Sequence, residues 1–277
     1  MSFFSWLFRR KKKPIDIKLG LALGSGGAKG FAILGALKAF EENDISFDII
    51  AGASIGSIIG AFYADGYTST DIYEILRHID AGEIKNFLMM NMNTEGLSKV
   101  IDREIGHKNI EDLKKPFFAI ATDKEKGTEK VFNSGKVATA LCASSCYPPF
   151  FKPVVIDDTE YIDGAFTNSV PADVVKNAGA DFVVGIDLAT HEKKQSFIMS
   201  LLPSYKGGVE EPWEKGYKNA DIMLHPDLSN YKAVSFMAGS EMYEIGYNTA
   251  VSNMEEIKEK IHALRFPTKK KKGKRNA

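Results

Sequence analysis

The feature that most constrains the fold of this chain is a short apolar run that enters the pattern Gly-x-Ser-x-Gly centred on Ser54. Residues 49–51 have the length and branching of a buried strand, and from Ser57 the apolar residues recur at helical spacing. A strand that turns sharply into a helix through Gly52 and Gly56 is a nucleophile elbow, in which a side chain at either glycine would collide with the crossing strand or helix. The Ser54 hydroxyl is then predicted to be exposed at the carboxyl end of a sheet, in a strained turn.

Taken alone, this pattern has a second interpretation. The chain contains 24 glycines in 277 residues, and a glycine-rich buried helix could begin here with Ser54 acting only as its cap. The surrounding sequence decides between the two.

A second glycine-rich turn, residues 24–30, follows the predicted first strand at residues 18–23. The dinucleotide-binding pattern requires glycine at its sixth position, where this chain has Lys29. A Walker loop requires glycine directly before the lysine and serine or threonine after it, but Ala28 and Gly30 occupy these places. Neither phosphate-binding pattern is met, so the loop is predicted to offer free backbone N–H groups at a helix N-terminus, suited to a developing oxyanion.

The rest of the chain alternates strand-like runs with helical patterns and has no internal repeat, which predicts a single α/β domain over residues 14–268. Further strands are predicted at residues 45–51, 117–122, 131–132, 182–186 and 221–224, with Asp163 at the end of another. Helices are predicted within residues 67–107, at residues 137–146 and in a last long helix, whose core face is assigned to Tyr247, Val251, Met254, Ile257, Ile261 and Leu264. Residues 87–90 suit either the core or a lid over an acyl chain, and the polar residues 191–219 are predicted to form a mobile excursion.

Charge is distributed unevenly along the chain, although its formal net charge is zero. Eleven of the 36 basic residues lie in residues 9–13 and 269–275, so residues 14–268 hold 25 basic against 36 acidic residues, a net of −11. An acidic body argues against a nucleic-acid enzyme and a nucleic-acid partner, because the basic surface of such a protein crosses the fold itself.

The two ends of the chain suit an anionic membrane surface. In residues 1–13 an aromatic and apolar block precedes the basic run; it is too short to span a bilayer and suits insertion into such a surface. A disordered, solubilising start is the alternative interpretation. The basic tail, residues 269–277, suits the same surface or a solvated end.

The cysteines and histidines indicate no metal site. Cys142 and Cys146 could share a helix face but have no second pair of ligands, so they are interpreted as small buried residues. No acidic cluster has the spacing of a calcium loop. Among the five histidines, His225 follows a predicted strand and is the one candidate for the base of a Ser-His-Asp triad; a surface residue at a strand end is the alternative.

Three motifs, in this order along the chain, resemble those of the patatin-like phospholipases, specifically the short bacterial members of this family. Residues 25–30 look like the family's oxyanion loop, residues 52–56 like its nucleophile elbow, and residues 163–165 like its Asp-Gly-Gly/Ala motif. The prolines and aromatics of residues 147–153 also fit, and the resemblance extends over residues 19–175. One departure is Ser25, where the family usually has glycine; the two glycines after it remain.

The resemblance implies a three-layer α/β/α fold with a mostly parallel central sheet, and a Ser-Asp dyad in place of a triad. Ser54 would attack an ester carbonyl, Asp163 would accept its proton, and the N–H groups of Gly26 and Gly27 would form the oxyanion hole. Burial would raise the pKa of the aspartate and make it a better base. No metal or other cofactor is required. The residues that support these motifs are Ser25, Lys29, Gly30, Gly52, Gly56 and Gly164.

The predicted function is therefore that of a serine lipid acyl hydrolase of phospholipase A or lysophospholipase type. It would cleave membrane phospholipids or lysophospholipids as a cytoplasmic protein, peripheral on the inner face of the cell membrane. One alternative is an acyltransferase that uses the same acyl-enzyme. The other is a non-catalytic, membrane-associated regulatory protein, against which the intact Ser54 and Asp163 weigh.

Overall fold

The structure is a computed structural model that describes residues 13–78, 94–189 and 211–267. Several sequence predictions lie outside these residues. They are almost all of the N-terminal surface segment, the apolar block at 87–90, the basic tail at 269–277, and most of the predicted excursion.

Eight strands form one mixed sheet within the described residues, in the order β5-β6-β3-β2-β1-β7-β8, with β4 also paired to β3. The strands are β1 (Leu19–Leu23), β2 (Ile49–Ala53), β3 (Phe117–Asp123), β4 (Thr128–Phe132), β5 (Val154–Ile156), β6 (Thr159–Asp163), β7 (Phe182–Ile186) and β8 (Ile222–Leu224). Strands β3, β2, β1, β7 and β8 are parallel to one another, whereas β4 and β6 pair antiparallel with β3, and β5 pairs antiparallel with β6. The predicted mostly parallel sheet is confirmed, and β3 and β4 form an antiparallel hairpin.

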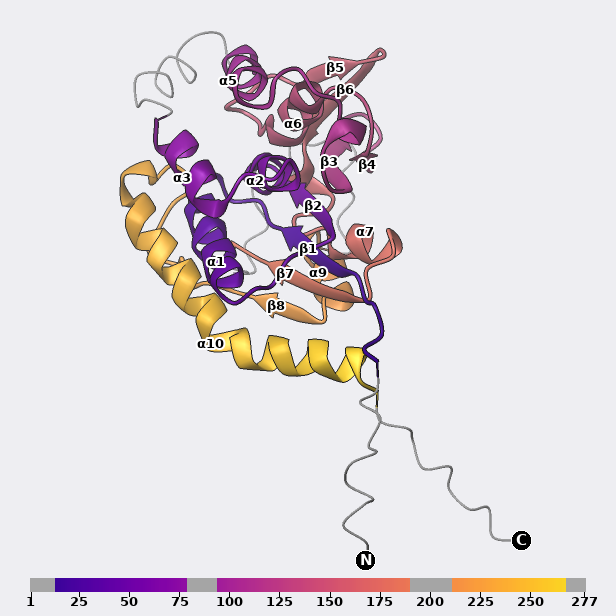
Figure 1. Cartoon of the computed structure of the whole chain (residues 1–277). Helices are drawn as coiled ribbons and strands as arrows, with labels where there is room; N and C mark the ends of the chain where they lie inside the picture. The colour runs from indigo at the N-terminus through magenta and orange to yellow at the C-terminus, as the bar shows by residue number, and fades with distance from the viewer. Residues whose placement is uncertain (1–12, 79–93, 190–210, 268–277) are drawn as a thin grey trace, which may run out of the picture.

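Helices cover both faces of this sheet (Figure 1). They are α1 (Gly30–Glu42), α2 (Ile55–Ala64), α3 (Ser69–His78), α5 (Glu95–Ile105), α6 (Val137–Ser145), α7 (Ala172–Asn177), α9 (Glu214–Asn219) and α10 (Gly239–Arg265). Helices α1 and α10 pack together on one side of the sheet, and α7 packs with α9 on the other. The three-layer α/β/α fold is therefore confirmed.

The alternation of side chains along β1 explains the two layers. Leu21 and Leu23 belong to the large core cluster beneath α1 and α10, whereas Ala22 belongs to a second cluster with Val175 of α7. On this second face a side chain at Gly20 would collide with Val175. Small residues on one face of β1 therefore allow α7 to approach the sheet closely.

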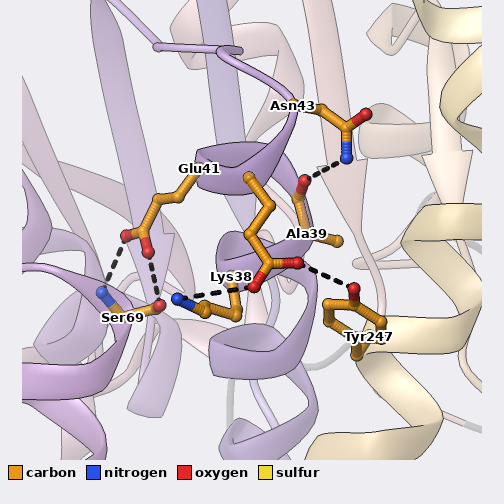
Figure 2. Close-up of polar contacts among 7 residues, drawn as sticks. Lys38, Ala39, Glu41, Asn43, Ser69 and Tyr247 are labelled. Carbon is orange, nitrogen blue, oxygen red and sulfur yellow. Dashed lines mark hydrogen bonds and ion pairs between the residues drawn. The ribbon is translucent and has the colours of Figure 1, made fainter.

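Polar contacts fix the end of α1 against two other helices (Figure 2). The Glu41 carboxylate accepts hydrogen bonds from the backbone N–H (2.8 Å) and the hydroxyl (2.6 Å) of Ser69, the first residue of α3. The Glu42 carboxylate accepts one from the Tyr247 hydroxyl on α10 (2.7 Å). These bonds hold α1, the helix that begins directly after the glycine-rich loop.

Two expectations about the C-terminal third need correction. On α10, Val251 and Leu264 are 45% and 40% exposed and do not belong to the core face. The core face instead includes Gly246 and Ala250, which are both buried. Gly246 lies so close to α1 that a side chain there would collide with the backbone of that helix. Residues 214–219, placed in the mobile excursion, form α9, which packs against α7.

Candidate active site

The turn between β2 and α2 holds Ser54 in the strained conformation that the elbow predicts. Its φ of 55° and ψ of −127° lie in a region that non-glycine residues rarely adopt. A side chain at Gly52 would collide with the carbonyl of Gly56, and one at Gly56 with the carbonyl of Leu23. Both glycines are therefore required sterically, and the predicted elbow is present.

Neighbouring serines hold this strained turn in place. The Ser54 N–H donates to the Ser144 hydroxyl oxygen at 3.0 Å, and the Ser54 carbonyl accepts from the Ser57 hydroxyl at 2.7 Å. Ser144 and Ser57 are buried, whereas Ser54 itself is partly exposed. Ser144 could not be predicted from the sequence, because it lies 90 residues from its partner and no local pattern marks it.

Asp163 ends β6, where it pairs with Ala121 of β3, and its side chain is buried. Its Oδ1 accepts a hydrogen bond from the Ala165 N–H at 2.8 Å and so caps the short 3-10 turn η4 (Gly164–Phe166). A side chain at Gly164 would collide with the backbone of β3. The hydroxyl of Thr122, a second residue that no sequence pattern marks, donates to the Asp163 carbonyl at 2.9 Å.

Burial raises the pKa of Asp163 to about 7, against the opposing effects of the Ala165 N–H and the Ser54 side chain. The Ser54 hydroxyl is thus close enough to lower the pKa of the carboxyl group. No hydrogen bond joins the Ser54 hydroxyl to this carboxyl group among the described residues, and Oδ2 of Asp163 is buried there without a partner. The carboxyl group therefore keeps one oxygen able to accept a proton, next to the serine.

The glycine-rich loop leaves β1 beside the elbow, because β1 and β2 are parallel neighbours with Leu23 opposite Gly52. The N–H groups on either side of the loop's centre are bonded: that of Ser25 donates to Ser169 (3.0 Å) and that of Ala28 to Ala233 (2.8 Å). Within the described part of the chain, the N–H groups of Gly26 and Gly27 have no acceptor. Two backbone donors are thus available at this point.

The other loop residues have structural contacts. The Lys29 ammonium group donates to the Leu188 carbonyl at 3.4 Å, and burial lowers its pKa while Asp187 opposes this shift. The Lys29 side chain therefore ties the loop to the chain that follows β7. A side chain at Gly30 would collide with Ile55, the residue after Ser54, so this glycine allows α1 and α2 to begin side by side.

His225 lies with a different group of residues. Its Nδ1 is 3.3 Å from the Tyr217 hydroxyl and 3.8 Å from Oδ2 of the buried Asp187. It follows β8, which is three strands from β2 in the sheet and hence about 14 Å away at the usual strand spacing. This separation disfavours His225 as the base for Ser54.

Cys142 and Cys146 are buried free thiols, and burial raises their pKa values to about 11 and about 12. The interpretation of these residues as small buried side chains is confirmed. In the described ranges, no three His, Cys, Asp or Glu side chains gather as metal ligands. Nor does any helix there have the length and apolar character to cross a membrane.

A model of the family described as patatin-like phospholipase matches residues 21–176, more than half of the chain. The chain belongs to the patatin-like phospholipase family. The resemblance inferred from the three motifs is thus confirmed.

Two relatives show how this chain compares with longer members of the family. Neuropathy target esterase sws of Drosophila melanogaster is 30% identical over 273 residues, which cover 83% of this chain and 19% of that protein. Lysophospholipase NTE1 of Kluyveromyces lactis is 24% identical over 285 residues, 87% of this chain and 19% of that protein. The chain therefore spans about a fifth of the length of these relatives.

The fold also matches a solved structure. VipD from Legionella pneumophila superposes with a TM-score of 0.56 at 14% identity, over 88% of this chain and 68% of that one. At this identity the likeness concerns the fold alone.

Proposed function

We propose that this member of the patatin-like phospholipase family hydrolyses carboxyl esters of membrane phospholipids or lysophospholipids through a Ser54–Asp163 dyad. The observation that carries the proposal is the unpartnered, buried Oδ2 of Asp163 close to a serine in a strained elbow. Unpartnered buried polar atoms are rare in folded proteins and call for an explanation. A role in proton transfer supplies one.

In the first half of the proposed reaction, Ser54 Oγ attacks the ester carbonyl carbon while its proton passes to Asp163. The N–H groups of Gly26 and Gly27 donate hydrogen bonds to the oxyanion of the tetrahedral intermediate. The carbon–oxygen bond to the lipid alcohol then breaks, and Asp163 returns the proton to the leaving oxygen. An acyl-enzyme on Ser54 remains.

In the second half, water attacks the acyl carbonyl and gives its proton to Asp163. The bond to Ser54 breaks, the serine recovers a proton from Asp163, and the fatty acid leaves. An aspartate with its ordinary pKa of about 3.9 is a weak base at neutral pH. A pKa of about 7 brings Asp163 near the optimum for accepting and returning a proton.

Labelling with a fluorophosphonate, alongside turnover of a phospholipid and a short soluble ester, tests the dyad. We expect Ser54→Ala to abolish labelling and Asp163→Asn to reduce labelling and turnover by roughly 10³-fold or more. His225→Ala, the matched control for a triad, should retain both. Loss of activity in His225→Ala alongside an active Asp163→Asn would overturn the dyad. Analysis of the acyl product distinguishes hydrolysis from acyl transfer.

We further propose that the protein works as a peripheral protein on the cytoplasmic face of the membrane, held through its basic segments at residues 9–13 and 269–275. Ile15, which follows the first segment, and Arg265, which precedes the second, are in contact: the Ile15 N–H donates to the Arg265 carbonyl at 2.9 Å. This place adjoins the start of β1, whereas Ser54 lies beyond the carboxyl end of β2. Ile15 and Arg265, which are close in sequence to these segments, therefore lie at the opposite end of the sheet from Ser54.

A further inference from the structure

The turn between β8 and α10 exposes three large apolar side chains within four consecutive residues. Val234 is 59%, Phe236 40% and Met237 95% exposed. The other large apolar side chains exposed in the described residues are separated along the chain, and single exposed residues of this kind are ordinary. The group formed by Val234, Phe236 and Met237, hereafter the apolar tip, is the exception.

Hydrogen bonds give the apolar tip a defined shape. The Lys232 N–H donates to the Ser235 hydroxyl oxygen, and the Ser235 N–H donates to the Lys232 carbonyl, both at 3.0 Å. The Tyr231 hydroxyl donates to Glu241 of α10 at 2.9 Å, which fastens the turn to that helix. The apolar tip is therefore held outward by a bonded turn, so its side chains need little reordering to meet a partner.

The same turn holds the candidate oxyanion loop. The Ala233 carbonyl, directly before Val234, accepts the hydrogen bond of the Ala28 N–H at 2.8 Å. Gly27 has a φ of +57°, and a side chain there would collide with this carbonyl. The backbone that carries the apolar tip thus touches the backbone that carries one of the two available oxyanion donors.

We propose that the apolar tip inserts into the surface of a phospholipid bilayer and sets the mouth of the candidate active site against the lipid. The inference rests on the proposed function, which requires an ester from the bilayer to reach Ser54. Apolar side chains beside a cation suit the boundary between head groups and acyl chains, and the exposed Lys232 lies two residues before Val234. This contact lies at the Ser54 end of the sheet, whereas Ile15 and Arg265, which are close in sequence to the basic segments, lie at the other end. The apolar tip, and not these segments, therefore sets the orientation of the active site.

The test compares Met237→Glu with Val251→Glu, a matched control on α10. Val251 is also exposed and lies about 18 Å along the helix from Gly239. Partitioning onto phosphatidylcholine vesicles is measured at about 0.5 M salt, where the attraction of basic segments to lipid is screened within a few ångströms. We expect Met237→Glu to weaken partitioning roughly 10-fold or more, since burial of a methionine side chain is worth about that factor. The ratio of vesicle to soluble-ester turnover should fall in parallel, and Val251→Glu should match the wild type.

Unchanged partitioning and an unchanged turnover ratio in Met237→Glu would overturn the proposal. So would a wild-type dimer, seen by light scattering, that Met237→Glu converts to a monomer, because the apolar tip would then bind a second copy of the chain. A wild-type protein that cleaves no soluble ester would instead refute the proposed function. Vesicle partitioning would still decide the role of the apolar tip in that case.

Discussion

Asp163 has a raised pKa that fixes the expected pH dependence of the reaction. Burial favours its neutral form and raises its pKa to about 7, yet a general base must be ionised to accept a proton. The specificity constant kcat/KM for a soluble ester should therefore fall about tenfold per pH unit below pH 7 and level off above it. Rates measured from about pH 5 to pH 9 check this.

An unperturbed histidine titrates near 6.5 and could produce a similar curve. The profile of His225→Ala decides between the two residues, and it should be identical to that of the wild type. A midpoint near 4 would contradict the raised pKa of Asp163, and a profile that changes in His225→Ala would contradict its assignment.

At the scale of single residues, the sequence was sufficient to predict those residues whose role depends on local backbone geometry. Gly52 and Gly56 could be predicted as required because each meets backbone within a few residues of Ser54 or on the adjoining strand. Ser144 and Thr122 could not, because each side chain holds a backbone group many residues away and leaves no periodic or motif signal. Their roles follow from the packing of α6 and β3 around the elbow.

At the scale of secondary-structure elements, close packing of α1 against α10 determines the stability of the layer above the sheet. A side chain at Gly246 would collide with the Ala32 carbonyl, and one at Gly35 with the Tyr243 carbonyl. We expect Gly246→Ala to lower the free energy of unfolding by roughly 2–3 kcal/mol, because backbone rather than a flexible side chain must move. Denaturation in urea measures this, with Val251→Ala as the control on the same helix, expected within about 0.5 kcal/mol of the wild type. A neutral Gly246→Ala would contradict the close approach.

This packing also explains which elements could be predicted. Strands β1, β2 and β7 and helix α6 lie close to where the apolar runs placed them, because large buried residues give a strong periodic signal. On α10 the periodicity of large apolar residues selected Val251 and Leu264, which are exposed. This periodicity gives no weight to Gly246 and Ala250, which lie on the buried face of the helix. Helix α9 was missed because its contact with the core also depends on a glycine, Gly216, which lies against the Val170 backbone.

At the scale of the whole molecule, the charge distribution predicts how the protein responds to anionic lipid. Residues 14–268 carry a net charge of −11, which repels an anionic surface, whereas the segments at 9–13 and 269–275 carry eleven basic residues. Each basic residue near such a surface contributes about 1 kcal/mol of attraction at physiological salt. Binding to anionic vesicles should therefore depend on these segments and decline steeply with salt.

Replacing the five basic residues of 9–13 with glutamine should weaken binding to vesicles containing phosphatidylglycerol by roughly 100-fold or more at about 0.1 M salt. The variant should retain soluble-ester turnover. Ile15, which follows the replaced segment, contacts Arg265 near the start of β1 and hence at the opposite end of the sheet from Ser54. Vesicle flotation measures the binding. Neutral phosphatidylcholine vesicles provide the control, since they should bind the variant and the wild type equally through the apolar tip. Equal binding of both proteins to anionic vesicles would show that the acidic body can approach anionic lipid without this basic segment. That result would contradict the proposed electrostatic contribution of residues 9–13 to the membrane contact.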